Sequence, residues 1–222
     1  MTRIRFRQNL DDLKEKLLVM AGMAEQAIQR SIEAYRVRDS SICDLVFRSE
    51  PAINRLEREI DQMAIDLLAM EQPMAIDLRF ILAVIKINAD VERVGDQAVN
   101  IAERVRDLQT MPPIDLPVDI PKLASMAASM VRHALQAFID ADADLAASVL
   151  TMDDQVDRMN TDAYRLLSKR IHDEPALAQQ ALNVLLIARN LERVGDHATN
   201  IAEDVIFWVR GADVRHHLQI GN

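Results

Sequence analysis

The sequence predicts an all-α protein made of two tandem antiparallel three-helix bundles, six long helices in all, related by internal duplication. Three observations lead to this fold class: apolar residues recur at helical spacing, one segment occurs twice, and Gly and Pro are rare, with 5 and 7 of 222 residues. Eleven Met outnumber the eight aromatic residues, whereas sheets are rich in aromatic and β-branched residues between frequent turns. An all-β or Rossmann-type fold is therefore disfavoured.

A duplicated segment divides the chain into two halves. Residues 92–105 read ERVGDQAVNIAERV and residues 192–205 read ERVGDHATNIAEDV, with eleven of fourteen positions identical at an offset of 100. The similarity extends upstream at an offset of 103, where Asp39 matches Asp142. Self-similarity at a fixed spacing indicates that each half is one structural unit.

A proline-rich segment separates the two units. Residues 111–121 contain four Pro, and proline is disfavoured inside a helix because it lacks the backbone N–H and clashes with the preceding turn. We therefore expect a first three-helix bundle over residues 1–110, a linker over 111–121 and a second three-helix bundle over 122–222.

Apolar stripes predict the helices of each unit. In the third expected helix of each half, apolar residues alternate in steps of three and four over about 25 residues, which predicts a long helix buried along one face and packed as in a coiled coil. Two further stripes predict the first and second helices. The stripes are Val84, Ile87, Val91, Val94, Ala98, Ile101, Val105 and Leu108; Val184, Ile187, Leu191, Val194, Ala198, Ile201, Val205 and Trp208; Leu10, Leu13, Leu17, Met20 and Ala24; and Ile53, Leu56, Ile60, Met63, Leu67 and Met70.

Five residues mark where these helices begin and end. Asp39 and Asp142 occupy the cap position between the first and second helices, where a side-chain oxygen accepts hydrogen bonds from free backbone N–H groups. Pro73 and Pro175 fit the start of the third helix of each half. Gly211 is expected to end the last helix.

Charge and composition disfavour several classes of protein. The formal net charge of −9 argues against a nucleic-acid-binding protein, which normally carries a basic face. The single cysteine, Cys43, excludes an intrachain disulfide. No run of about 18 apolar residues occurs, so no membrane-spanning helix is predicted. We expect a cytoplasmic protein without direct membrane insertion.

A stripe of acidic and amide residues follows the third helix of each half, facing away from the apolar seam. It is the same in both halves, whereas Gln97 is replaced by His197, as expected for outward positions that diverge. Acidic residues at i and i+4 repel by a few tenths of a kcal/mol, and a mid-helix glycine such as Gly95 or Gly195 costs about 1 kcal/mol relative to Ala. Retaining both features suggests that the carboxylates hold a cation and that the glycines admit a group close to the backbone. The stripe residues are Glu92, Asp96, Asn100 and Glu103, and Glu192, Asp196, Asn200 and Glu203.

The second helix of each half supplies facing ligands. Glu50, Asn54, Glu57 and Asp61 lie on one helix face in the first half, and Asp153, Asp157 and Asn160 are their counterparts. Carboxylate and amide oxygens suit hard ions such as Fe³⁺, Mn²⁺, Mg²⁺ or Ca²⁺, and Zn²⁺ also accepts carboxylates. We expect two metal sites, one from Glu50, Asn54, Glu92 and Asp96, and one from Asp153, Asp157, Glu192 and Asp196.

The duplicated motif, residues 92–103 and 192–203, closely resembles that of the PhoU family. Gln72 and Pro73, followed by Asp77, Leu78 and Arg79, resemble the start of that family's third helix, and the resemblance runs over residues 10–208. It implies two similar three-helix bundles. It further implies a cytoplasmic regulator of phosphate homeostasis, not an enzyme, that represses the phosphate-starvation response when phosphate is plentiful.

The resemblance also implies partners and cofactors. The partners would be the ATPase subunit of the phosphate ABC transporter and a phosphate-sensing histidine kinase, and the protein would form a homodimer. Similar members bind iron or zinc clusters through E(D)xxxD pairs, with Mg²⁺ or Mn²⁺ as alternatives.

The sequence departs from the family pattern in the first half. Asn54 stands where an acid is usual, and a neutral amide is a weaker ligand than a carboxylate. Pro51 is expected to kink the second helix beside it. We therefore predict that the second-half site, with Asp153 and Asp157, is the stronger metal site.

Arg93 and Arg193 are retained beside the acidic stripes. Arg suits the recognition of phosphate and carboxylate groups, so two interpretations remain open: an ion pair with a neighbouring helix, or contact with a partner protein.

Two other functions also fit the acidic stripes. One is a carboxylate-bridged metalloenzyme, although no His follows a Glu by three residues, as in ferritin-like di-iron bundles. The other is a helical scaffold whose acidic residues are only solvated, which predicts no stoichiometric metal.

Overall fold

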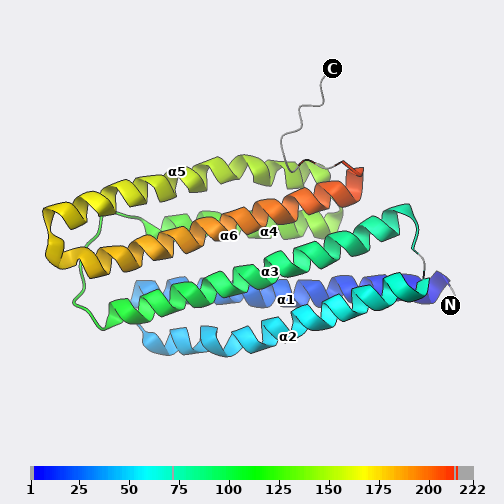
Figure 1. The fold of residues 1–222 in the computed structure, drawn as a ribbon, viewed down its shortest axis with the longest axis horizontal. Coiled ribbons are helices and arrows are strands. Elements are labelled where there is room, and N and C mark those ends of the chain that lie inside the picture. Colours follow the sequence, from blue (N-terminus) through cyan, green and yellow to red (C-terminus); the bar gives the residue numbers. More distant parts are fainter. Residues whose placement is uncertain (1–2, 72, 213, 215–222) are drawn as a thin grey trace, which may run out of the picture.

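The structure, a computed structural model, describes residues 3–71, 73–212 and 214, so the outer ends of both expected domains lie outside the described residues. Within these residues the chain forms six α-helices and one short 3₁₀ helix (Figure 1). They are α1 (Arg3–Val37), α2 (Ser40–Glu71), α3 (Ala75–Gln109), α4 (Ile120–Asp140), α5 (Ala143–Asp173), the 3₁₀ helix η1 (Pro175–Leu177) and α6 (Ala178–Arg210).

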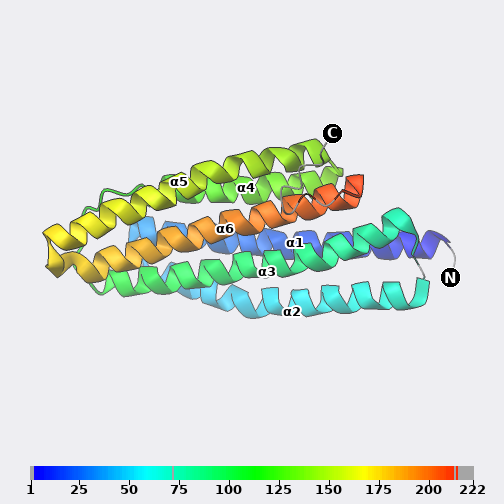
Figure 2. The same cartoon turned by 45° about the horizontal axis from the view of Figure 1, so that its top comes forward.

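The helices form two three-helix bundles that lie side by side (Figures 1 and 2). The first bundle contains α1, α2 and α3, and the second contains α4, α5 and α6. At the centre α3 and α6 run antiparallel and make the most extensive helix–helix contact of the described residues, and α1 also touches α4. The predicted all-α fold of two duplicated bundles is confirmed, and the two bundles pack into one molecule.

The apolar stripes form the core. Every residue of the α3 stripe is buried, and so is the α6 stripe as far as Val205. Trp208 is half-buried, with its ring centroid 5.1 Å from that of Phe80 on α3 and 5.5 Å from that of Phe138 on α4. Met70, near the end of α2, is an exception to the prediction because it is 61% exposed. Burial of the other stripe residues supplies the main driving force for packing.

The predicted caps are confirmed. Asp39 Oδ1 accepts a hydrogen bond from the Ser41 backbone N–H at 2.9 Å. Asp142 Oδ1 accepts from two backbone N–H groups at the start of α5, at 2.9 and 3.0 Å. Gly211 follows α6 with φ 69°, and its N–H donates to the Phe207 carbonyl at 2.9 Å. A left-handed residue directly after a helix favours glycine, which carries no Cβ.

Prolines mark helix starts, with one difference from expectation. Pro73 precedes α3 by two residues, and Pro175 opens the 3₁₀ helix that leads into α6. The fourth helix begins at Ile120, two residues before the expected start of the second bundle, because proline is tolerated in the first turn of a helix. Asp119 caps this helix by accepting a hydrogen bond from the Lys122 N–H at 2.9 Å.

Pro51 does not interrupt α2, which is helical on both sides of it. The side chain is exposed, so the ring lies on the outer face of the bundle rather than in the core. Among the described helices, none combines the length and the apolar character needed to cross a membrane.

Candidate metal centre

Three carboxylates of the second half converge between α5 and α6. Asp153 and Asp157 lie one helical turn apart on α5, and Asp196 faces them from α6. One oxygen of each lies within 4.8 Å of the others. The i, i+4 spacing places the first two on one face, and packing of α5 on α6 brings the third to them. This is the arrangement expected of the second-half site, and no other group of three such ligands occurs in the part of the chain that the structure describes.

Two buried oxygens at this site lack hydrogen-bond partners. Asp153 Oδ1 and Glu192 Oε2 are buried, and no described residue donates to either atom. An unpaired buried carboxylate oxygen is unfavourable unless a donor or a cation satisfies it. The chemistry and position of these oxygens therefore fit an oxygen-ligated metal ion.

The carboxylates also perturb one another's charge. Burial, followed by the charges of Asp157 and Asp196, raises the pKa of Asp153 to about 6. Burial and then the charge of Asp157 raise the pKa of Asp196. In both cases burial is the largest cause and neighbouring negative charge the next, and a bound cation would relieve the repulsion between these carboxylates.

Glu192 lies one turn before Asp196 on α6 but outside the group of three. Its side chain is 12% exposed and forms an ion pair with Arg189 on the same helix. Burial and the charge of Asp196 raise the pKa of Glu192, and the charge of Arg189 lowers it. The predicted fourth ligand is therefore present beside the cluster but is held by an internal cation.

The first half has a related but looser cluster between α2 and α3. Burial, followed by the charges of Asp96 and Glu57, raises the pKa of Glu92 to about 7, and Glu50 contributes to the same effect. Asn54 Oδ1 is buried without a hydrogen-bond partner among the described residues. Glu50 and Asp96 thus lie near Glu92, and Glu57, which the sequence placed on this face, adds a further negative charge.

The two motif glycines allow neighbouring helices to pack closely. A Cβ on Gly95 would lie 3.1 Å from Ile53 Cδ1, and a Cβ on Gly195 would lie 3.4 Å from Val156 Cγ1 and 3.6 Å from Asp153 Oδ1. In each half the group that packs close to the glycine backbone is therefore a side chain of the neighbouring helix: Ile53 at Gly95 and Val156 at Gly195. This close packing also sets the distance across which the acidic residues face one another.

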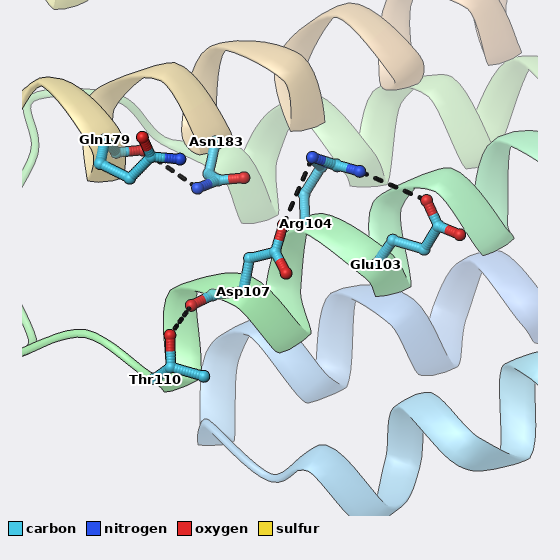
Figure 3. A network of polar contacts seen from close by, with 6 residues as sticks. All are labelled: Glu103, Arg104, Asp107, Thr110, Gln179 and Asn183. Carbon is cyan, nitrogen blue, oxygen red and sulfur yellow. Dashed lines mark hydrogen bonds and ion pairs between the residues drawn. The ribbon is translucent and has the colours of Figure 1, made fainter.

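The remaining residues of the two predicted acidic stripes do not join the carboxylate clusters in the described structure. Asn200 Nδ2 donates to Asp90 Oδ1 at 3.1 Å across the α3–α6 contact, and Glu203 lines a cavity of about 290 Å³ between the same helices. In the first half, Glu103 pairs with Arg104 at 3.3 Å, as Figure 3 shows. The remaining stripe residue, Asn100, is half-buried on α3.

The contact between the bundles contains a buried polar group that sequence reasoning missed. His197 Nδ1 lies 2.9 Å from Asp90 Oδ1, and Asp90 is only 7% exposed. Lys86 pairs with Asp204 at 3.1 Å nearby. The replacement of Gln97 by His197 was attributed to outward drift, but Gln97 is buried and His197 half-buried. The change from Gln97 to His197 between the halves was the available signal. It indicates this contact when positions 97 and 197 are placed toward the other bundle rather than toward solvent.

Arg93 and Arg193 are exposed, and neither forms an ion pair within the described part of the chain. Of the two open interpretations, the ion pair with a neighbouring helix is therefore not found among the described residues. Both guanidinium groups are accessible next to the acidic clusters.

The fold and the site define an all-helical protein of two duplicated bundles with carboxylates gathered between helices. Comparison with known protein families identifies the family to which the chain belongs. The family model described as the PhoU domain matches residues 17–105 and again residues 120–205. The chain therefore belongs to the PhoU family.

Individual relatives agree with this assignment. The phosphate-specific transport system accessory protein PhoU homolog of Pseudomonas aeruginosa is 39% identical over 215 residues, which span 96% of this chain and 88% of the relative. The crystal structure of PhoU from Pseudomonas aeruginosa matches with a TM-score of 0.90 at 38% identity, covering 93% of this chain and 100% of that one. The phosphate transport system regulatory protein PhoU from Streptococcus pneumoniae matches with a TM-score of 0.83 at 25% identity, covering 94% and 99%. The chain is thus a PhoU-like accessory or regulatory protein of phosphate transport, and not an enzyme.

Proposed function

We propose that this protein is a cytoplasmic negative regulator of phosphate homeostasis. It would repress the phosphate-starvation response when phosphate is plentiful and would moderate uptake through the phosphate ABC transporter. The observation that carries this proposal is similarity over 96% of the chain to a phosphate-specific transport system accessory protein. The match spans both bundles, so the regulatory unit would be the whole duplicated molecule.

The proposed partners are the ATPase subunit of the transporter and a phosphate-sensing histidine kinase. Arg93 and Arg193 support docking because they are exposed beside the acidic clusters and form no ion pair among the described residues. A guanidinium group pairs with carboxylate or phosphate through two parallel hydrogen bonds. We propose that these two arginines contact a partner, and that the protein acts as a homodimer.

We further propose that the acidic clusters hold metal ions that shape the docking surface. Asp153, Asp157 and Asp196, with Glu192 beside them, would hold the stronger site, and iron or zinc would be the ion, with Mg²⁺ or Mn²⁺ as alternatives. The unpartnered oxygens at this site support the proposal. The first-half site would use Glu50, Asn54, Glu92 and Asp96. The outer stripe residues Asn100, Glu103, Asn200 and Glu203 would contribute only in a conformation different from the one described.

A reporter strain tests the regulatory role. Deleting the gene should give high alkaline phosphatase activity in phosphate-rich medium, and the wild-type gene should restore low activity. Low activity after deletion, in a strain without a second copy of the gene, would contradict repression by this protein.

The same strain tests the carboxylates. The double variant E192A/D196A should fail to restore repression, whereas D11A/D12A, which removes two exposed acids of α1, should restore it fully. Full repression by E192A/D196A would leave the protein a regulator whose second-half cluster is only solvated, as in the scaffold interpretation.

A further inference from the structure

The two acidic clusters differ in one nearby cation. In the second half Arg189 lies three residues before Glu192 on α6, whereas Ala89 holds the corresponding position before Glu92 on α3. The motif that follows is otherwise the same over most of its length. At this position, therefore, only the second-half cluster has a cation.

Arg189 binds Glu192, the predicted ligand that lies outside the cluster of three carboxylates. Its Nη1 donates to Glu192 Oε1, and Glu192 is the one predicted second-half ligand outside the group formed by Asp153, Asp157 and Asp196. The other oxygen of Glu192 is buried without a partner among the described residues. The charge of Arg189 also lowers the pKa of both Glu192 and Asp196, so it acts on the cluster and not only on its direct partner.

We propose that Arg189 is the internal counter-ion of the second-half cluster, and that Glu192 completes the set of metal ligands only when Arg189 is displaced from it. The inference rests on the proposed metal site. A guanidinium and a metal ion are both cations, and they compete for the same carboxylate. Arg189 therefore sets how tightly the second-half site binds metal, whereas Ala89, its counterpart, offers no cation to Glu92 from that position.

Arg189 has room to move when it leaves Glu192. Its side chain is 56% exposed, and it lines a cavity of about 360 Å³ between α5 and α6 whose wall includes Tyr164 and Leu186. Rotation of an exposed arginine requires no change in the core. Metal occupancy would thus change the position of a positive charge on the outer face of the second bundle.

Zinc titration of the full-length protein tests the competition. The protein is first stripped of metal with a chelator, and the first-half site is disabled by E92Q/D96N in every sample. Calorimetry with Zn²⁺ then compares R189Q with R193Q, the matched control. Arg193 lies on the same helix, is exposed and also lowers the pKa of Asp196, but it forms no bond to Glu192.

We expect R189Q to lower the Kd for Zn²⁺ about fivefold and R193Q to lower it less than twofold, because only R189Q frees a ligand as well as removing a charge. In the E192Q background the advantage of R189Q over R193Q should disappear. Conversely, A89R should weaken Zn²⁺ binding at the first-half site when the second-half site is disabled by D153N/D157N.

Equal Kd values for R189Q and R193Q, or weaker binding by R189Q, would overturn the counter-ion role while leaving the metal site in place. Absence of Zn²⁺ binding in every variant would overturn both the inference and the metal site. The phosphatase reporter separately decides whether the protein is a regulator.

Discussion

The carboxyl group of Glu92 gives a clear expectation for how the stability of the protein depends on pH. Burial and neighbouring negative charges raise the pKa of Glu92 to about 7 from 4.5. Between these values the folded protein binds more protons at this residue than the unfolded chain does. The free energy of unfolding of the metal-free protein should therefore fall as the pH rises from about 4.5 to 7.

Urea unfolding at pH 5, 6 and 7 in the presence of a chelator measures this slope. E92Q should reduce the slope without abolishing it, because glutamine does not titrate but Asp153, Glu192 and Asp196 keep their raised pKa values. E15Q on the exposed face of α1 should leave the slope unchanged. The same slope in E92Q as in wild type would show that another group causes the dependence.

At the same scale, the sequence predicted that Asp153, Asp157 and Asp196 converge, but it also placed Glu192 among them, and Glu192 lies outside the group. The spacing of Asp153 and Asp157 on one helix, together with the duplicated motif, was enough to place Asp196 opposite them. The pairing of Asp90 with His197 was missed because it depends on how α3 and α6 are rotated against each other. The apolar periodicity of one helix identifies its buried face, but it does not identify which neighbour covers each edge of that face.

Glycine-to-alanine substitutions at three helix positions should change the free energy of unfolding by different amounts, according to the space around each glycine. Gly22 in α1 has nothing within 4 Å of an added Cβ, so G22A should stabilise the protein by about 1 kcal/mol through helix propensity. G95A should gain less, because its Cβ would lie 3.1 Å from Ile53 Cδ1. G195A, with its nearest contact at 3.4 Å, should fall between them.

Urea unfolding at constant pH gives the three free energies. In an I53V background the Cδ1 atom is absent, so G95A should recover most of the missing stabilisation. A gain from G95A equal to that from G22A in the wild-type background would show that Ile53 yields freely and that the glycine is not required by packing.

Element boundaries followed from local chemistry and were predicted well. The caps at Asp39, Asp142 and Gly211 are where the sequence placed them, since a cap depends only on neighbouring backbone groups. The start of α4 was placed late, because a proline tolerated in a first turn resembles one that ends a linker. Met70 was placed in the core because its spacing is right, but it lies near the end of α2, where it is exposed.

Across the whole molecule, the buried pair at the α3–α6 contact ties the two bundles together. H197A should lower the free energy of unfolding by about 1–3 kcal/mol, because Asp90 is 7% exposed and would lose one of its partners. H197Q, which introduces the residue found at the corresponding position 97, should lower it less. Denaturant unfolding at pH 7 measures both, and a stability of H197A equal to that of wild type would show that the pair contributes nothing net.

The side-by-side packing of two similar bundles in one chain has a consequence for how the molecule can change. In a symmetric assembly of two identical subunits, any substitution would appear at both copies of a position. Here each copy varies alone, so Arg189 can accompany one cluster while Ala89 accompanies the other. Likewise His197 pairs with Asp90, whereas their counterparts are Gln97 and Asn190. Joining the two bundles in one chain thus gives the molecule two sides that differ chemically, although each side is built from a copy of the same unit.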